Sequence, residues 1–276
     1  MILNYNSWEM TNKLALKLAT FEGIKRVVIV DNQSTDKSYE MLSRIKNEKI
    51  KVILSEKNGG YCYGNNLGVR ELADERLDIA FIVNPDVDIA ESSVLEILRA
   101  FQTTEYKLLS GVEYDIDDNL SNPPIWVNMT YKDDMLSCSF LGRKRKKVYP
   151  HIQSAGVQEV DLVKGSFLAF KIQDFLEVGG FDENVFLFCE KRIIARKFRD
   201  KKKIGIVLAA KYNHNHTASI NKTYKASARQ MKILYQSRWY YNVKYNKIGK
   251  IKKIILKISM NISLMEFRIV DLMRGK

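Results

Sequence analysis

The sequence repeats a short strand, a polar loop and a helix, and this alternation constrains the fold more than any other feature. The run "IKRVVIVD" (24–31) predicts a strand, "NQSTD" a loop, and "KSYEMLSRIK" has apolar residues at helical spacing. A second unit begins at "IKVILSE" (50–56), and "DIAFIVNPDVDI" (78–89) predicts a further buried strand. Strands that alternate with helices predict a mostly parallel, doubly wound α/β sheet that binds its ligand at the carboxyl ends of the strands.

Length and cysteine content narrow the class of protein. A chain of 276 residues can bury the core of one large domain, or of one domain with an appendage. Cys62, Cys138 and Cys189 are widely spaced and form neither a disulfide framework nor a zinc-binding pattern, which favours a reducing compartment. We expect no signal peptide and no membrane-spanning helix, because no apolar stretch reaches about 18 residues.

A dinucleotide-binding fold would begin with the same alternation, but the glycines are in the wrong place for it. That fold needs a glycine-spaced phosphate loop directly after its first strand. The first strand here, "MILNY", is followed by "NSWEMT", which contains no glycine. The glycine-rich segment "NGGYCYGNNLG" (58–68) follows a later strand and matches neither that fingerprint nor a P-loop.

Several motifs, in one order and over roughly residues 1–220, resemble the family 2 glycosyltransferases, and most closely the rhamnosyltransferase-like enzymes of bacterial surface polysaccharide synthesis. The motifs are "ILNYNS" (2–7), "VVIVDNQSTDKS" (27–38), "EKNGGYCYGNNLGV" (56–69), "FIVNPDVDI" (81–89), "VKGSFLAF" (163–170) and "VGGFDENVFLFCE" (178–190). The resemblance implies a GT-A fold, a nucleoside diphosphate sugar donor, a divalent cation such as Mn²⁺ or Mg²⁺, and an inverting single displacement. It also implies a saccharide acceptor, which in similar enzymes is usually linked to a lipid.

Polar and glycine residues after the expected strands form the predicted donor site. Asp31 ends a buried strand and is expected to accept a hydrogen bond from the nucleobase or ribose, with a turn or helix cap as the alternative. Gly59 and Gly60 permit close approach of the backbone to a ligand, whereas Gly165 is as well suited to a tight bend. The expected donor-binding residues are Asn6, Asp31, Asn32, Ser34, Asn58, Gly59, Asn65, Asn66, Asn84 and Gly165.

The acidic cluster "NPDVD" is the predicted metal site. A nucleoside diphosphate carries negative charge that a hard divalent cation with oxygen ligands neutralises well. The resemblance makes Asp86 the first choice of ligand, with Asp88 a weaker candidate, whereas Asn84 stands where many relatives have Asp. An ordinary Pro-Asp turn at the strand end is the alternative.

Two histidines add to the predicted metal site. The segment "KYNHNHTASI" (211–220) places His214 and His216 on one side of an extended strand. The resemblance puts a histidine with the spacing of His214 near the metal and the diphosphate, and His216 could contact the acceptor instead. A pair of surface histidines without a functional role is the alternative.

Glu190 is the predicted catalytic base. An inverting transfer needs a carboxylate that takes the proton from the attacking acceptor hydroxyl. Relatives usually show two adjacent acids here, but Lys191 and Arg192 follow Glu190 in this chain. Three interpretations follow: Glu190 is the base despite the two neighbouring cations, the base is Asp182 or Glu183, or the protein is catalytically impaired.

The C-terminal quarter is strongly basic. Residues 201–276 carry 18 Lys and Arg against two acids, a net +16, whereas the remainder carries −3. Segment 246–273 has an apolar stripe at near-helical spacing, with lysines between its members. Such a helix lies on anionic lipid or packs its stripe on the catalytic domain, and the first interpretation is favoured. The stripe is Ile251, Ile254, Ile255, Ile258, Ile262 and Met265.

The sequence therefore predicts a GT-A-like catalytic domain (1–220) with a basic helical C-terminal extension (221–276). The expected activity is glycosyl transfer to a lipid-linked saccharide in cell-surface polysaccharide synthesis, by a cytoplasmic protein held at the inner face of the plasma membrane. A catalytically impaired relative that binds a donor or partner is the first rival. A nucleic-acid-binding protein, suggested by the basic tail alone, is the second, and no nucleic-acid partner is expected.

Overall fold

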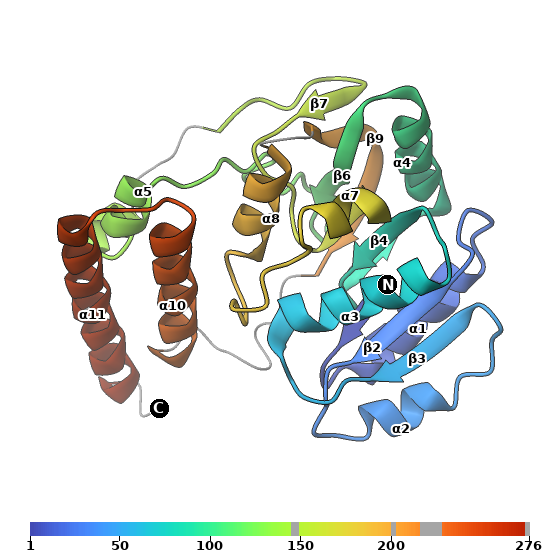
Figure 1. Cartoon of the computed structure of the whole chain (residues 1–276), viewed down its shortest axis with the longest axis horizontal. Coiled ribbons are helices and arrows are strands. Elements are labelled where there is room, and N and C mark those ends of the chain that lie inside the picture. The colour runs from blue at the N-terminus through green and yellow to red at the C-terminus, as the bar shows by residue number, and fades with distance from the viewer. Residues whose placement is uncertain (145–148, 200–202, 216–227, 274–276) are drawn as a thin grey trace.

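A computed structural model describes residues 1–144, 149–199, 203–215 and 228–273 (Figure 1). Its first half is a parallel sheet in the order β1-β2-β3, with Asp31 aligned between Asn4 and Leu54 at the carboxyl ends. The strands are β1 (Ile2–Asn4), β2 (Val27–Asp31) and β3 (Ile50–Leu54). The next strand, β4 (Ile79–Val83), joins β1 in a parallel pattern, because the amino group of Met1 donates to the Phe81 carbonyl and the Val83 N–H donates to the Met1 carbonyl.

The second half is a mixed sheet in the order β4-β8-β6-β9-β5, with β7 paired to β9. Its other strands are β5 (Val87–Ile89), β6 (Tyr106–Tyr114), β7 (Val157–Glu159), β8 (Phe167–Lys171) and β9 (Lys203–His214). Among the described strands of this sheet, only β6 and β9 pair in parallel; β8 runs antiparallel to β4 and β6. The expectation of a mostly parallel sheet therefore holds for β1 to β4 but not for this half, because β8 begins at the edge where β4 ends.

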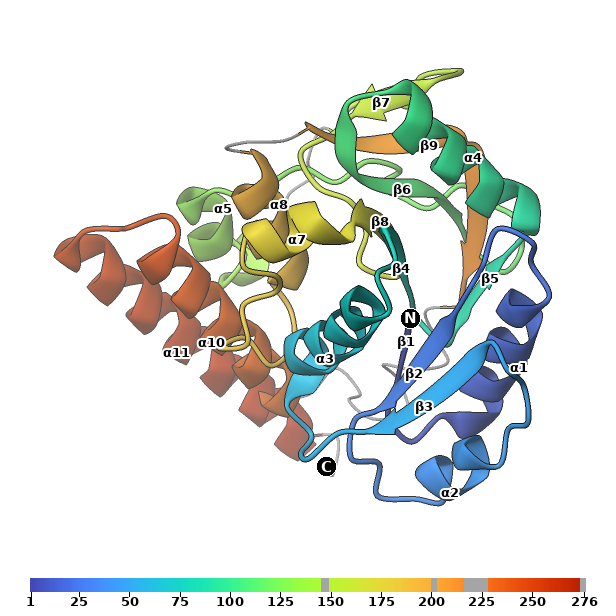
Figure 2. The ribbon, with the colours of Figure 1, turned by 45° about the vertical axis from the view of Figure 1, so that its right-hand side comes forward.

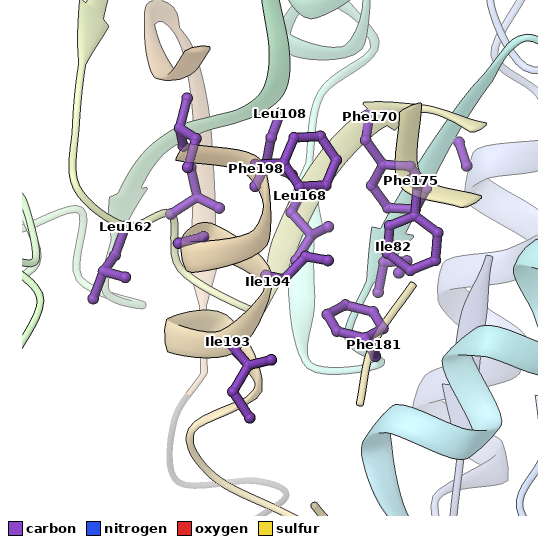
Figure 3. Packing of buried hydrophobic residues seen from close by; sticks show 14 of the residues in the cluster. Ile82, Leu108, Leu162, Leu168, Phe170, Phe175, Phe181, Ile193, Ile194 and Phe198 are labelled. Atoms are coloured by element: carbon purple, nitrogen blue, oxygen red, sulfur yellow. The ribbon is translucent and has the colours of Figure 1, made fainter. Parts of the chain in front are cut away.

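Helices cover both faces of the sheet. Successive side chains of β2 point to opposite faces and all are buried, so both faces must be covered. Val27 and Ile29 pack in one buried cluster with α1 (Trp8–Ala19) and α4 (Glu91–Thr103). Val28 and Val30 point to the opposite cluster, which other helices cover. Those helices are α3 (Gly60–Asp74), α7 (Ile172–Glu177) and α8 (Glu190–Arg199). Figure 3 shows Ile194 and Phe198 of α8 near Leu108 and Leu168 of the sheet, with Ile193 of the same cluster farther along the helix.

Glycines allow α3 to pack closely on the side chains at the start of β1. A β-carbon on Gly64 would lie 2.3 Å from Leu3 Cδ1, and one on Gly68 would lie 2.6 Å from Met1 Cγ. These two residues and Gly60 are spaced four apart, so they follow one stripe of the helix. The first turn of α3 is thereby held at the carboxyl end of β1.

The C-terminal segment forms a helical hairpin of α10 (Ala228–Lys244) and α11 (Lys250–Met273). Figures 1 and 2 show α10 between α11 and the part of the molecule that contains the sheets. Leu256 and Met260 of α11 are buried in a cluster with Tyr235 of α10. The remaining helices are α2 (Ser38–Ser43), α5 (Tyr131–Leu136) and α6 (Phe140–Arg143). The predicted domain boundary at residue 220 lies outside the described residues and stays a prediction.

The predicted apolar stripe of α11 faces outward. Ile251, Ile258 and Met265 are 74%, 54% and 61% exposed, and the other stripe residues are exposed too. Packing of this stripe on the catalytic domain, one of the two interpretations of the sequence, is therefore wrong. The reason is that α11 is two-faced, and Leu256, Met260 and Ser263 supply its buried side. Among the helices that the structure describes, none is both long and apolar enough to cross a membrane.

Candidate active site

The carboxyl ends of β1 and β2 hold an ordered polar loop. Asp31 is fully buried; its Oδ2 accepts from Asn4 Nδ2 at 2.7 Å and from Ser34 Oγ at 2.7 Å, and its Oδ1 accepts from the Ser34 N–H. Asn6 closes the loop, because its amide exchanges hydrogen bonds with Thr35. Here Asp31, Asn6 and Ser34 order the loop, and their contact with a nucleotide stays a prediction. The sequence analysis did not identify Asn4 as part of this loop network. A polar residue inside a very short strand is the feature that could have indicated it.

A second set of contacts ties this loop to the start of α3. Asn32 Nδ2 donates to Asn58 Oδ1 at 3.0 Å, and Asn58 Oδ1 also accepts from the Gly60 N–H at 3.2 Å. Gly60 has φ +81°, and a β-carbon there would lie 2.2 Å from the Phe186 carbonyl oxygen. That carbonyl accepts the N–H of Tyr61 at 2.8 Å. The segment that leads to Glu190 is thus fixed against the first turn of α3.

The other donor-binding candidates in this region behave differently. Asn66 donates to the Phe181 carbonyl and to Glu183, and its Oδ1 accepts the Phe181 N–H. Its amide holds residues 181–183, and a contact between Asn66 and the donor stays a prediction. Asn65 is fully buried and donates to the Tyr61 carbonyl. Gly59 is required locally, since a β-carbon there would lie 2.4 Å from the ring of Tyr63.

Asp86 and His214 meet at the predicted metal site. Asp86 lies between β4 and β5, and His214 ends β9 opposite Val87. Nε2 of His214 lies 3.2 Å from Oδ1 of Asp86, and Nδ1 lies 3.2 Å from Oε2 of Glu113. Burial alone would lower the pKa of His214, but hydrogen bonds to the two carboxylates outweigh burial and raise that pKa to about 9.

Glu113 is the organising residue that the sequence reading missed. It is buried on β6, and its carboxylate accepts from Lys164 Nζ at 2.9 Å, Ser166 Oγ at 2.9 Å and the Tyr212 hydroxyl at 3.0 Å. Ser121 Oγ donates to it as well. Its signal is a lone acid inside an apolar strand, which demands partners when buried. Glu113 thereby fixes residues 164–166 beside His214.

The donor set suits a hard divalent cation with few protein ligands. Mg²⁺ and Mn²⁺ favour oxygen ligands, and Mg²⁺ usually keeps water and binds substrate phosphates rather than an all-protein cage. Asp86 supplies a carboxylate, and His214 would supply an imidazole nitrogen after losing the proton that the two carboxylates stabilise. Asp88, the weaker candidate, is exposed on β5 between the buried Val87 and Ile89 and pairs with Lys17. Within the described residues, no group of three or more His, Cys, Asp or Glu side chains is arranged to hold a metal. His216 lies outside them.

Glu190 begins α8 and faces residue Gly165. A β-carbon on Gly165 would lie 3.6 Å from Oε1 of Glu190, and the Tyr61 hydroxyl donates to the Gly165 carbonyl at 2.7 Å. Oε2 of Glu190 is buried without a hydrogen-bond partner among the residues that the structure describes. Phe188 and Cys189, just before it, have φ of 67° and 61°, a strained backbone that is common at functional sites. A carboxylate oxygen without a donor is suited to accept a proton.

The segment Lys164–Ser166 brings the two halves of the site together. Ser166 binds Glu113, which contacts His214, and the preceding Gly165 faces Glu190. The Asn84 N–H donates to the Ser166 carbonyl at 2.8 Å, which joins the same segment to the end of β4. Two neighbouring residues thus separate the metal side from the predicted base.

Arg192 has a structural role that its position in the sequence did not reveal. Its guanidinium makes two hydrogen bonds with the Asp134 carboxylate, at 3.0 Å and 2.9 Å, and donates to the Met129 carbonyl. It also lies over the ring of Tyr241, 4.0 Å from the centroid. Asn242 of α10 donates to the same carboxylate at 2.7 Å. Arg192 therefore joins α8 to α5 and to the C-terminal hairpin.

The alternative bases are engaged elsewhere. Asp182 accepts from the Tyr245 hydroxyl at 2.6 Å, the Tyr240 hydroxyl at 2.9 Å and Lys244 Nζ at 3.0 Å. Burial would raise the pKa of Asp182, but the hydrogen bonds, led by that from Tyr245, hold it below its usual range. Glu183 is exposed and binds Asn66. Both acids support the loop before α8.

Residues 1–150, more than half of the chain, match the family model for glycosyl transferase family 2, and the chain therefore belongs to this family. The low-salt glycan biosynthesis hexosyltransferase Agl10 of Haloferax volcanii is 23% identical over 241 residues, which cover 87% of this chain and 73% of that relative.

Solved structures agree on the fold. GalNAc-T7 with UDP, GalNAc and Mn²⁺ has a TM-score of 0.58 at 14% identity, over 98% of this chain and 56% of that chain, so this chain spans little more than half of its length. S. aureus TarS 1–349 in complex with UDP-GlcNAc has a TM-score of 0.53 at 13% identity, over 97% of this chain and 72% of that chain. The GT-A fold that the resemblance predicted is thereby confirmed.

Proposed function

We propose that the protein transfers a sugar from a nucleoside diphosphate sugar to a lipid-linked saccharide, with inversion at the anomeric carbon, during cell-surface polysaccharide synthesis. The observation that carries this proposal is the segment Lys164–Ser166, which is fixed by Glu113 on the Asp86 side and faces Glu190 through Gly165. The hexosyltransferase relative and the UDP-bound structural neighbours support a nucleotide-sugar donor. The resemblance to rhamnosyltransferase-like enzymes makes a rhamnosyl donor one to test early.

In this proposal Glu190 is the general base. The acceptor oxygen forms a bond to the anomeric carbon, the bond from that carbon to the diphosphate breaks, and the hydroxyl proton passes to Oε2 of Glu190. Asp86 and His214 are the side chains that would hold Mn²⁺ or Mg²⁺, whose chemistry at such a site is to neutralise the departing diphosphate. Asp182 is a poor alternative base because its carboxylate already accepts hydrogen bonds from α10.

The rival interpretation, a catalytically impaired relative, has less support once the contacts of Arg192 are known. It was based on Lys191 and Arg192 beside Glu190, but the charge of Arg192 is matched by Asp134 in a buried ion pair. An arginine that holds helices together is compatible with an active carboxylate two residues away.

The test begins with a thermal-shift screen of nucleotide sugars with Mn²⁺, because a ligand that binds the folded state raises its apparent stability. Transfer from the selected donor should require the cation and should fall by about 10²-fold or more in Glu190→Gln, the range expected for loss of a general base. Glu183→Gln, an exposed acid of the same loop, is the matched control. The anomeric configuration of the product, read by NMR, tests inversion. Full activity of Glu190→Gln would end the proposal.

A second observation supports work at an anionic membrane surface, which we propose as the inner face of the plasma membrane. The exposed stripe of α11 is flanked by exposed Lys250, Lys252 and Lys257, and basic amphipathic helices of this kind bind anionic lipid. Binding to vesicles that contain phosphatidylglycerol should exceed binding to neutral vesicles. It should fall in the double variant Ile258→Asp and Ile262→Asp, but not in Asn261→Asp. Equal binding by all three proteins would refute this part.

A further inference from the structure

Lys191 is a cation for which neither the fold nor the proposed chemistry gives a role. It is the second residue of α8, directly after Glu190, and its ammonium lies 3.9 Å from the centroid of the Trp126 ring. Among the residues that the structure describes, no carboxylate pairs with Lys191. Arg192, the next residue, differs in this respect because it is neutralised by Asp134.

Lys191 also lies close to the segment that faces Glu190. Burial lowers the pKa of Lys164, the ion pair with Glu113 opposes that effect, and the nearby charge of Lys191 lowers the pKa further. Lys164 precedes Gly165, whose α-carbon faces Oε1 of Glu190. Lys164 is matched by Glu113 at 2.9 Å, so Lys191 is the cation of this pair that can receive an outside anion.

Trp126 anchors the ammonium of Lys191 beside the segment that faces Glu190. It lies on the loop between β6 and α5 and pairs with Leu162 at an isolated bridge, beside residues 163–165. Its Nε1 is buried without a hydrogen-bond partner among the described residues. Aromatic faces supply apolar contact area, and a cation held over the ring is oriented by the quadrupole of the indole. The lysine is therefore held in a defined place.

We propose that Lys191, held on Trp126 next to Glu190, binds a negatively charged group of the acceptor and makes the enzyme selective for anionic acceptors. The proposal rests on the proposed function, since it names the chemical class of the acceptor. The anion is either a carboxylate on the sugar or the phosphate that links the saccharide to its carrier; both would form a charge-assisted hydrogen bond with the ammonium. Lys191 would also offset the repulsion between that anion and the carboxylate of Glu190.

The experiment compares matched acceptors. Each sugar is offered as its neutral octyl glycoside, as the corresponding octyl uronide, and as its octyl phosphodiester, and kcat/KM is measured for each acceptor. In the wild type, one charged form should exceed the neutral form. In Lys191→Met, the ratio of charged to neutral kcat/KM should fall about tenfold, the effect expected for loss of a hydrogen bond between charged groups. Lys191→Arg should retain most of the ratio.

Arg196→Met removes an exposed cation from the same helix and should leave the ratio unchanged. Whichever charged form loses its advantage in Lys191→Met, the uronide or the phosphodiester, identifies the source of the anion. An unchanged ratio in Lys191→Met would overturn the proposal. If no acceptor is used at all, the proposed function fails by itself. Binding of the same compounds, measured by ligand-observed NMR in wild type and Lys191→Met, then decides the role of Lys191, and equal preference overturns it.

Discussion

Removal of the Asp134 carboxylate should destabilise the protein strongly, because it leaves the charge of Arg192 buried. The side chains of Asp134 and Arg192 are 0% and 6% exposed. Breaking a buried pair from one side typically lowers the free energy of unfolding by about 3 to 5 kcal/mol. Such a loss is a large part of the roughly 5 to 15 kcal/mol that stabilises a typical domain. We expect this range for Asp134→Asn, since Asn242 and Arg238 also lose a charged partner.

Urea denaturation followed by circular dichroism measures this change, with Glu40→Gln as the control. Glu40 pairs with Arg44 on the surface, and both side chains are mostly exposed. Loss of such a pair changes stability by at most about 1 kcal/mol. The double variant Asp134→Leu and Arg192→Met should recover part of the loss, because it removes the buried charge of Arg192 and leaves only the partly exposed Arg238 without its carboxylate. A loss below about 1 kcal/mol in Asp134→Asn would refute the structural role of Arg192.

Three further predictions follow from single contacts. Asp182 has a lowered pKa in the folded state, so its ionised carboxylate contributes to the free energy of unfolding above the ordinary aspartate pKa of about 3.9, and this contribution is lost as pH falls below that value. When the free energy of unfolding is measured against pH, Asp182→Asn should therefore lose less stability below pH 4 than the wild type does. Identical curves for the two proteins would contradict this. Gly60→Ala should lower the free energy of unfolding, measured in urea, by about 2 kcal/mol or more, because alanine is strained at a positive φ and its β-carbon would clash with the Phe186 carbonyl. An unchanged free energy of unfolding would contradict the close approach of Gly60 to Phe186. Asp86→Asn should weaken Mn²⁺-dependent donor binding by calorimetry, and unaltered affinity would remove Asp86 from the metal site.

Local periodicity predicted the units of the fold but not every strand direction. The run of apolar residues at 27–30 correctly predicted a buried strand, and the structure places Val27 and Ile29 on one face of β2 and Val28 and Val30 on the other. The direction of β8 depends on the path that the chain takes after β6, because β8 begins at Phe167, opposite Val83 at the end of β4. No periodic pattern inside "VKGSFLAF" encodes that path.

Motifs in the sequence singled out Asp86, His214 and Glu190; the structure places Asp86 beside His214 and Glu190 beside Gly165, and their roles stay predictions. The candidate site was not predictable where the partner lies far away in the chain. Arg192 read as a cation near the base, yet its partner is Asp134, 58 residues earlier. The contacts of Glu113 likewise come from residues up to 101 positions away in the chain.

The exposed stripe of α11 illustrates the same limit for a helix. Hydrophobic spacing identified an amphipathic pattern, but it could not tell which side of the helix is covered. Tertiary packing covers Leu256 and Met260, which contact the cluster around Tyr235, and leaves Ile258 exposed. Both sides carry apolar residues, so only the fold distinguishes them.

The most direct test is a crystal structure of the protein with Mn²⁺ and an unreactive analogue of the donor selected by the thermal-shift screen. We predict the cation between the diphosphate and the side chains of Asp86 and His214. The carboxylate of Glu190 should face the anomeric carbon from the side opposite the diphosphate. A diphosphate bound away from Asp86, or an anomeric carbon that Glu190 does not face, would contradict the account.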